Sequence, residues 1–537
     1  MLEMNRLLST ALLLVLSVPA GAATLHLTGY DAKGRALDSR SLLRYIAPIR
    51  HEERGVPPGR AGFYLADLGG HPVPGAPWWD SRSKTPALRW EDAKSVTLSM
   101  PWPIQDDGFS TVLLDGGGNG YVDGRKILLN EEIALSAYRM MRSSLKNRRE
   151  AWKPLYHPTQ NVLKLTEKAR KAITKAKAAR EPRKKAKLFD KALTTIAFAW
   201  QQILYEHGRQ VAIDPALGRR LRYGLSLDES LLGRLAEHDR IADALKDSGA
   251  NWVRLVFGVP KGDFTFSREA SFSVYDSFID KLDRRGIKVM GSVLDSMLWP
   301  KRLSSKTYAR RAANLARRYR GRISSWEVAS EPNADWLGSS QKPISRKQVL
   351  LCVQKAIVAL KRVDRSIETV ATLHWWEGTA RRQAHALFPW LDWAASRGFG
   401  RGIDVIALSV YPHRHPMGIA FDRVFAELHE RFPDKSLMLG GFSFADESEL
   451  QGYWWLEKDS VKDARKDLLV LYMGTSAAVP TGLGGGFYGP TLQHMLPPES
   501  RPTALFQLHR RTMARLLKDR KKNRPKKPKK KKRKKRK

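Results

Sequence analysis

The chain has 537 residues, of which 42% are hydrophobic and 28% are charged, a composition typical of a folded protein with two or three domains. Its single cysteine excludes an intramolecular disulfide. The formal net charge of +40 at pH 7 indicates contact with polyanions, but by itself it indicates no chemistry.

The chain begins with a pattern typical of a secretory signal. Residues 1–22 combine an arginine, an apolar run at 7–18 and small residues at 20–22. The apolar run is too short to span a bilayer, and no later apolar stretch is long enough to do so. We therefore expect a signal peptide and a secreted or periplasmic protein, with a retained signal anchor as the alternative.

Two segments follow with different periodicities. Residues 24–130 hold short alternating runs such as SVTLSMPWPI, broken by Gly, Pro and Asp, which predict a β-rich, sandwich-like domain. Residues 131–215 change to helical spacing, with Pro182 between two of the helices. Between Arg142 and Lys191 there are 17 basic and 4 acidic residues. This basic helical arm is either a polyanion-binding surface or simply a solvated helix face.

From 221 to 517 the chain alternates strand and helix eight times, which predicts an α/β (β/α)8 TIM barrel. A doubly wound open sheet is the competing fold. It is disfavoured because no Gly-rich phosphate-binding turn follows the first strand. The predicted strands are LRYGLSL, NWVRLVFGV, GIKVMGSVL, ISSWEVAS, ETVATLHWW, IDVIALSVY, SLMLGGFSF and GLGGGFYG.

The chain ends in a polybasic segment, 518–537, with 16 Lys or Arg residues and one Asp. Such a segment repels itself and has no apolar surface to bury, so we expect a disordered tail. It can attach to nucleic acid, acidic polysaccharide or an anionic membrane by releasing counterions. The tail therefore predicts attachment and not chemistry.

Polar side chains collect where the predicted strands end, which is the edge at which barrels of this kind build their sites. In chain order they are Arg254, Asp295, Ser330, Glu331, His374, Ser409 and Tyr411. Tryptophans crowd the same edge: Trp299, Trp336, Trp375, Trp376, Trp454 and Trp455. Rings beside carboxylates suit a polyhydroxylated ligand, whose C–H faces stack while its hydroxyls form hydrogen bonds. Core packing is the alternative for any single tryptophan.

The run WEVASEP at 326–332 resembles the fourth-strand motif of the clan-A glycoside hydrolases, usually W-E-x-x-N-E-P, whose second glutamate is the general acid/base. NWVRLV, IDVIALSVYP and PDKSLMLGGFSF resemble that family's second, sixth and seventh strands, so the resemblance covers about residues 221–517. It implies a glycan ligand and Glu331 as general acid/base. The substrate-binding residues that it implies, together with those at the strand ends, are Arg254, Ser330, Asn333, Trp336, His374, Trp375, Ser409 and Tyr411.

Three positions depart from the family pattern. Ser330 replaces the asparagine before the acid, Ser409 replaces the sixth-strand histidine, and Gly441 occupies the nucleophile position. Retaining hydrolysis needs two carboxyls about 5–5.5 Å apart, and a glycine supplies none. It also predicts a space that would admit a small anion or a water. A second carboxylate would have to come from Asp446, Glu447, Asp295 or Glu377.

Two functions stay open at this point. The first is a secreted glycoside hydrolase with an atypical or missing nucleophile. The second is a catalytically inactive carbohydrate-binding barrel, attached to an anionic surface by the basic arm and tail. Either way we expect an oligo- or polysaccharide partner, no cofactor, no metal, no specific nucleic acid and a monomeric chain. A nucleic-acid-binding protein, the third possibility, rests on charge alone.

Overall fold

The computed structural model describes residues 22–46, 63–79, 85–104, 108–339, 342–375, 383–411, 417–443 and 476–517. The apolar run of the predicted signal and the polybasic tail both lie outside these residues. Within them, no helix is both long and apolar enough to cross a membrane.

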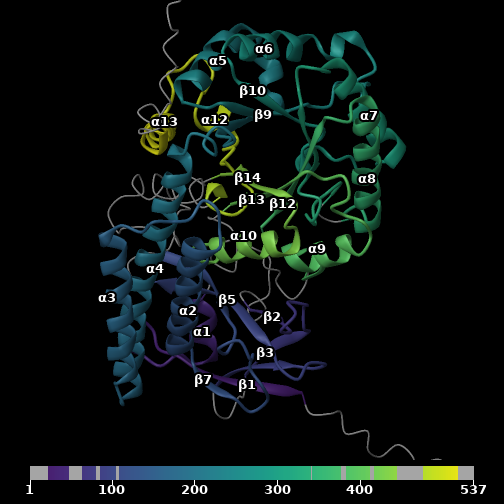
Figure 1. Ribbon diagram of the computed structural model, residues 1–537. Coiled ribbons are helices and arrows are strands. Elements are labelled where there is room, and N and C mark those ends of the chain that lie inside the picture. Colours follow the sequence, from purple (N-terminus) through teal and green to yellow (C-terminus); the bar gives the residue numbers. More distant parts are fainter. Residues whose placement is uncertain are drawn as a thin grey trace, which may run out of the picture.

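Eight parallel strands form a barrel in the second half of the chain (Figure 1). Each strand pairs with the next in sequence order. Bridges between Arg222 and Gly484 and between Leu225 and Tyr488 join the first strand to the last. The eight-stranded barrel is therefore confirmed over the open sheet. Its strands are β8 (Gly224–Leu227), β9 (Trp252–Val256), β10 (Lys288–Ser292), β11 (Ser325–Ser330), β12 (Glu368–His374), β13 (Val405–Val410), β14 (Ser436–Phe442) and β15 (Gly482–Gly485).

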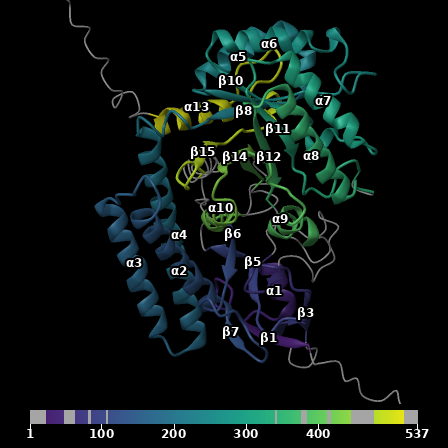
Figure 2. The same cartoon turned by 45° about the vertical axis from the view of Figure 1, so that its right-hand side comes forward.

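Helices surround the barrel strands, as Figure 2 shows. Their apolar faces are buried against the strands, and several begin at a capping side chain. Ser304, for example, accepts a hydrogen bond from the backbone N–H of Thr307 at the start of α7. The helices are α5 (His238–Asp247), α6 (Ser273–Arg284), α7 (Ser305–Arg318), α8 (Arg346–Val363), α9 (Leu387–Ala395), α10 (Ala420–Arg431), α12 (Thr491–His494) and α13 (Ala504–Leu517). The 3-10 helices are η2 (Glu229–Gly233), η3 (Leu235–Glu237), η4 (Glu269–Ser271), η5 (Ser296–Leu298) and η6 (Gln383–His385).

The N-terminal part contains two small sheets. One has the strand order β3-β4-β1-β7 and the other β2-β5-β6. The predicted β-rich character agrees with these strands, while their packing as a sandwich stays a prediction. The elements are β1 (Ala23–Thr28), α1 (Ser39–Tyr45), β2 (Tyr64–Ala66), β3 (Gly75–Trp79), β4 (Pro86–Trp90), β5 (Thr97–Ile104), β6 (Gly108–Leu114) and β7 (Lys126–Leu128).

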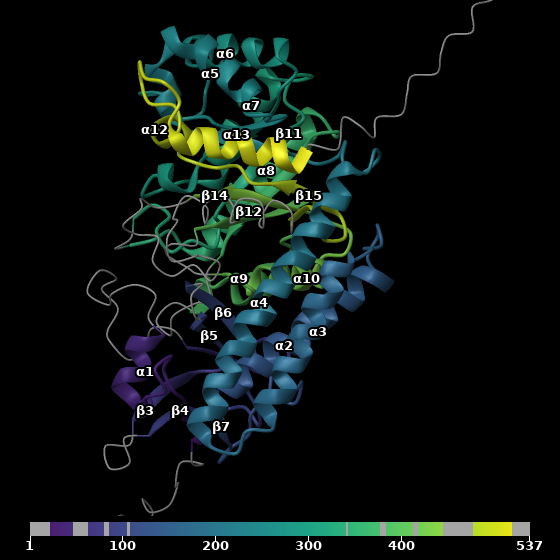
Figure 3. The same ribbon diagram turned by 90° about the vertical axis from the view of Figure 1, so that its left-hand side faces the viewer.

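Three long helices follow where helical spacing was predicted: α2 (Leu129–Glu150), α3 (Gln160–Lys177) and α4 (Pro182–Ile213). Pro182 stands in the first turn of α4, where a missing backbone N–H costs nothing. The three helices lie side by side along the sheets and the lower barrel (Figure 3). Whether their exposed cations bind polyanions stays a prediction.

A buried polar network joins this helical layer to the barrel. Arg148 of α2 is fully buried and forms an ion pair with Asp422 of α10. The second carboxylate oxygen of Asp422 accepts from the Trp200 indole N–H at 3.0 Å. Burial, together with the nearby Arg148 charge, lowers the pKa of His207 to about 3, so a neutral ring accepts from Arg148 at 2.9 Å. The N-terminal part is thereby anchored to the outside of the barrel.

Candidate functional site

The barrel interior is built in layers along the strands. The lowest layer is apolar and contains Trp252, Met290, Val370, Val405, Ala407, Met438, Leu483 and Phe487. Two residues further along their strands stand Arg254, Ser292 and Thr372, around the carboxylate of Glu327. Side chains two apart on a strand share a face, which explains this stacking. A polar layer thus separates the apolar core from the carboxyl end of the barrel.

Arg254 and Glu327 form a buried ion pair in that polar layer. Arg254 Nη2 lies 2.6 Å from Glu327 Oε2, and Glu327 is completely buried. Ser292 and Thr372 each donate a hydroxyl to the same carboxylate at 2.5 Å. Burial works to lower the pKa of Arg254, but the neighbouring carboxylates outweigh it and raise that pKa. The hydrogen bonds from Arg254, Ser292 and Thr372 therefore satisfy the buried Glu327 side chain, as a buried pair must be satisfied to persist.

Arg254 also connects this layer to the mouth of the barrel. Its Nη2 donates to Asp295 Oδ2 at 2.8 Å and to Ser330 Oγ at 3.2 Å. Asp295 in turn caps η5 by accepting from the Met297 N–H at 3.1 Å. The predicted arginine and two of its predicted neighbours therefore lie together.

Glu331 follows β11 directly and has an unusual backbone conformation. Its φ is +50°, in the left-handed region that residues with a side chain seldom adopt. The backbone holds it there, since its N–H donates to Thr372 O at 2.7 Å and its carbonyl accepts from Ala334 N–H at 2.9 Å. Strain of this kind collects at functional sites, where it directs a side chain. Here it directs the carboxylate of Glu331 toward β13.

Three hydroxyls surround the carboxylate of Glu331. Ser409 and Tyr411 donate to Oε1 at 2.6 and 2.9 Å, and Ser296 donates to Oε2 at 2.6 Å. The ring of His374 completes the surroundings, with Nδ1 at 3.7 Å from Oε1. The carboxylate is thus surrounded by donors, and the residue is only 5% exposed.

This cage favours the ionised form of Glu331. Burial works to raise its pKa, but the nearby His374 ring and the hydrogen bonds from Ser296 and Ser409 outweigh burial and bring the pKa down to about 2. The ionised form of Glu331 is therefore favoured in the unliganded chain. Its role as general acid/base stays a prediction.

Gly441 lies in close contact with Ser409. A Cβ built on Gly441 would lie 2.9 Å from the Cβ of Ser409 and 3.8 Å from the hydroxyl of Tyr411, so a side chain at this position would require Ser409 to move. Gly441 and Ser409 are register partners on β14 and β13. Binding of a small anion beside this glycine stays a prediction.

Two predicted ligand contacts are buried in the structure. Trp375 is 1% exposed and belongs to the hydrophobic core. Asn333 is completely buried and braces two loops: its amide donates to the carbonyls of His374 and His385 and accepts from the His374 N–H. Contact of either side chain with a ligand stays a prediction.

The other predicted aromatic side chains that the structure describes lie either beside His374 or in the core. Trp336 stands edge-on to His374 with ring centroids 5.0 Å apart, and His374 lies 5.6 Å from Tyr411. Trp299 is buried against Tyr308. Several predicted residues lie outside the described residues: Trp376, Glu377, Asp446, Glu447, Trp454 and Trp455.

Glu327 and Ser296 are the main residues that sequence reasoning missed. Ser296 directly follows the predicted Asp295, so one more residue at that strand end would have included it. Glu327 is the first glutamate of the WEVASEP motif, so the signal that could have found it was already in the sequence.

No family model and no curated protein matches the sequence. Solved structures that resemble the fold include the family 1 β-glucosidase from Thermotoga maritima, at 10% identity and a TM-score of 0.35 over 50% of this chain and 87% of that one. The Ignisphaera aggregans GH53 catalytic domain gives 20% identity and a TM-score of 0.36, covering 52% and 87%. The exo-β-1,4-mannosidase from Opitutaceae bacterium strain TAV5 gives 13% identity and a TM-score of 0.40, covering 56% and 60%. Any function must therefore be argued from the residues at the barrel mouth.

Proposed function

We propose that this chain binds a carbohydrate at the carboxyl ends of the barrel strands and does not cleave it by double displacement. The observation that carries the proposal is the caged carboxylate of Glu331, which three hydroxyls hold beside the rings of His374 and Tyr411. The resemblance of WEVASEP to the glycoside hydrolase motif supports the same ligand class.

The geometry of the cage leaves room for one more donor. An ionised carboxylate offers about four acceptor positions. Among the described residues, two hydroxyls bond to Oε1 of Glu331 and one to Oε2. One acceptor position on Oε2 can therefore take a hydroxyl of a sugar, while Trp336 and Tyr411 offer ring surface for its C–H groups. A charge-assisted bond of this kind is about twice as strong as a neutral one.

Double displacement is disfavoured for two reasons. Glu331 is ionised and cannot protonate a leaving oxygen without first gaining a proton against a pKa of about 2. Gly441 has no side chain, and Ser409 lies in close contact with it. Asp295, a carboxylate at the mouth, is held by Arg254.

Hydrolysis by Glu331 together with Asp446 or Glu447 is the second candidate. The strained φ of +50° at Glu331 favours it, since such strain is typical of catalytic positions. In this case Glu331 would act as a base, and the second carboxyl would supply the acid.

Attachment and location complete the proposal. We infer that the chain is exported and that its cations hold it on an anionic surface near its glycan. Eleven exposed Lys or Arg residues lie between 164 and 191 on α3, α4 and the turn joining them. Binding of this kind releases counterions and weakens as salt rises.

The test compares binding and cleavage in four proteins: wild type, Glu331→Ala, Glu331→Gln and Glu368→Gln. Glu368 is a matched control, because it is a barrel carboxylate that pairs with Arg222 at the opposite end of β12. Titration calorimetry with a panel of neutral and acidic oligosaccharides should show binding that falls at least tenfold in Glu331→Ala and persists in Glu368→Gln. If wild type binds no member of the panel, the proposal fails. Cleavage that Glu331→Gln abolishes would establish the second candidate instead.

A further inference from the structure

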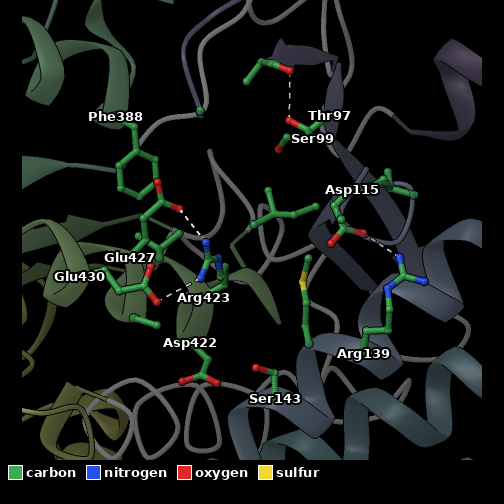
Figure 4. Close-up of a pocket in the computed structure, with 18 of the residues that line it drawn as sticks. Thr97, Ser99, Asp115, Arg139, Ser143, Phe388, Asp422, Arg423, Glu427 and Glu430 are labelled. Carbon is green, nitrogen blue, oxygen red and sulfur yellow. Dashed lines mark hydrogen bonds and ion pairs between the residues drawn. The ribbon is translucent and has the colours of Figure 1, made fainter. Parts of the chain in front are cut away.

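A second cavity lies outside the barrel, between the N-terminal part and the outer helices. Its volume is about 800 Å³, within the range of small-ligand sites. The sheet β2-β5-β6 and α2 form one wall, and α9 and α10 form the other (Figure 4). None of the residues that cage Glu331 lines it, so it is a separate cavity.

Charges in this cavity come in opposed pairs. Arg139 of α2 lies 2.7 Å from Asp115 at the end of β6. Across the cavity Arg423 of α10 lies between two carboxylates, 3.8 Å from Glu427 and 3.5 Å from Glu430 (Figure 4). The two Arg423 contacts are too long for strong hydrogen bonds, so the guanidinium keeps donor capacity. Both walls therefore offer planar donors and acceptors side by side, with more carboxylates than guanidiniums in the lining.

Hydroxyls and apolar surface complete the walls. Ser99 of β5 is 5% exposed, and its hydroxyl has no hydrogen-bond partner among the described residues. Ser143 of α2 is exposed and also lines the cavity. Phe388 of α9 and Trp152 after α2 add ring surface. A buried hydroxyl without a partner costs free energy, which a bound hydroxyl group would recover.

We propose that this cavity is a binding site for a neutral oligosaccharide. The cavity is lined by five carboxylates and three guanidiniums, and this excess of negative charge argues against phosphate and other anionic ligands. The number of polar groups argues against a purely apolar ligand, because each would be desolvated without a partner. A neutral sugar fits both conditions, since its hydroxyls donate and accept while its C–H faces pack on rings. The site does not depend on Glu331.

The experiment uses full-length Glu331→Ala protein, in which the barrel mouth is disabled, with cellotriose, xylotriose and mannotriose as separate probes. Saturation-transfer NMR and titration calorimetry should detect binding of at least one probe. Adding Ser143→Trp should fill the cavity and weaken that binding at least tenfold. Adding Lys146→Trp is the matched control, because Lys146 is exposed on the same helix and does not line the cavity.

Each outcome either supports or overturns the proposed sugar site in this cavity. If no probe binds the Glu331→Ala protein, the cavity is no site for neutral sugars. Binding that Ser143→Trp leaves unchanged would place the sugar elsewhere on the chain. Should Ser143→Trp fail to fold, Ser99→Ala together with Arg423→Gln removes the hydroxyl and the guanidinium and should cause the same loss. Binding in wild type that Glu331→Ala removes completely would leave only the barrel-mouth site.

Discussion

Replacing Glu331 by glutamine tests the ionised state of this carboxylate through folding stability. Its pKa falls from the ordinary 4.5 to about 2 in the folded chain, because hydroxyl and imidazole donors outweigh burial. Each tenfold change in proton affinity corresponds to about 1.4 kcal/mol, so this difference amounts to about 3 kcal/mol. An acid with a lowered pKa contributes stability that is fully present above about pH 4.5 and lost as pH falls toward 2. The glutamine side chain is neutral at every pH, so its contribution to the free energy of unfolding does not change with pH.

The assay is urea unfolding followed by tryptophan fluorescence, for wild type and Glu331→Gln in parallel from pH 7 to pH 2.5. The stability of wild type relative to the variant should be about 2.5 kcal/mol greater at pH 7 than at pH 2.5, with the change concentrated below pH 5. Glu368→Gln, at the other end of the barrel, is the control for loss of a carboxylate. A variant that is more stable than wild type at pH 7 and loses this advantage as pH falls to 5 would mean a raised pKa. Glu331 would then be a proton donor, and the cage argument would be wrong.

Three further outcomes are expected. Gly441→Ala should lower the free energy of unfolding in urea by about 1–3 kcal/mol, because the new Cβ meets Ser409. Adding Ser409→Gly to the same chain should recover most of this loss. An unchanged free energy of unfolding in Gly441→Ala would contradict the close contact. Arg148→Met leaves Asp422 buried without its cation and should cost about 3–5 kcal/mol, whereas Arg149→Met on the exposed face should cost less than about 0.5; equal effects would refute the buried network. Truncation after Leu517 should leave Tm unchanged and flatten the salt dependence of binding to anionic surfaces, and an unaltered salt slope would show that the tail takes no part.

The barrel was predictable because its signal is repeated along the chain. Each of its strands is a short apolar run between amphipathic segments, and nearly all strand residues are buried, as in parallel sheets covered by helices. Chain order then leaves few ways to pair the strands. The closing bridges at Arg222 and Leu225 follow from the same order.

The site was predictable only in part, because its details depend on three-dimensional complementarity. The sequence places Glu331, Ser409 and Tyr411 at strand ends, and the structure brings them into hydrogen-bond contact. The burial of Trp375 in the core depends on packing that the sequence does not show. The close contact between Gly441 and Ser409 was not predictable, since it depends on a register shift between β13 and β14. The second cavity was equally hidden, because distant segments form its walls.

The central claim is binding without cleavage at the barrel mouth. The most direct measurement incubates wild-type protein with each oligosaccharide that it binds in calorimetry, and follows the chain length of the sugar by mass spectrometry. Our account predicts saturable binding that depends on Glu331 and a sugar that keeps its length. Shortened products that appear with wild type and disappear with Glu331→Gln would contradict it.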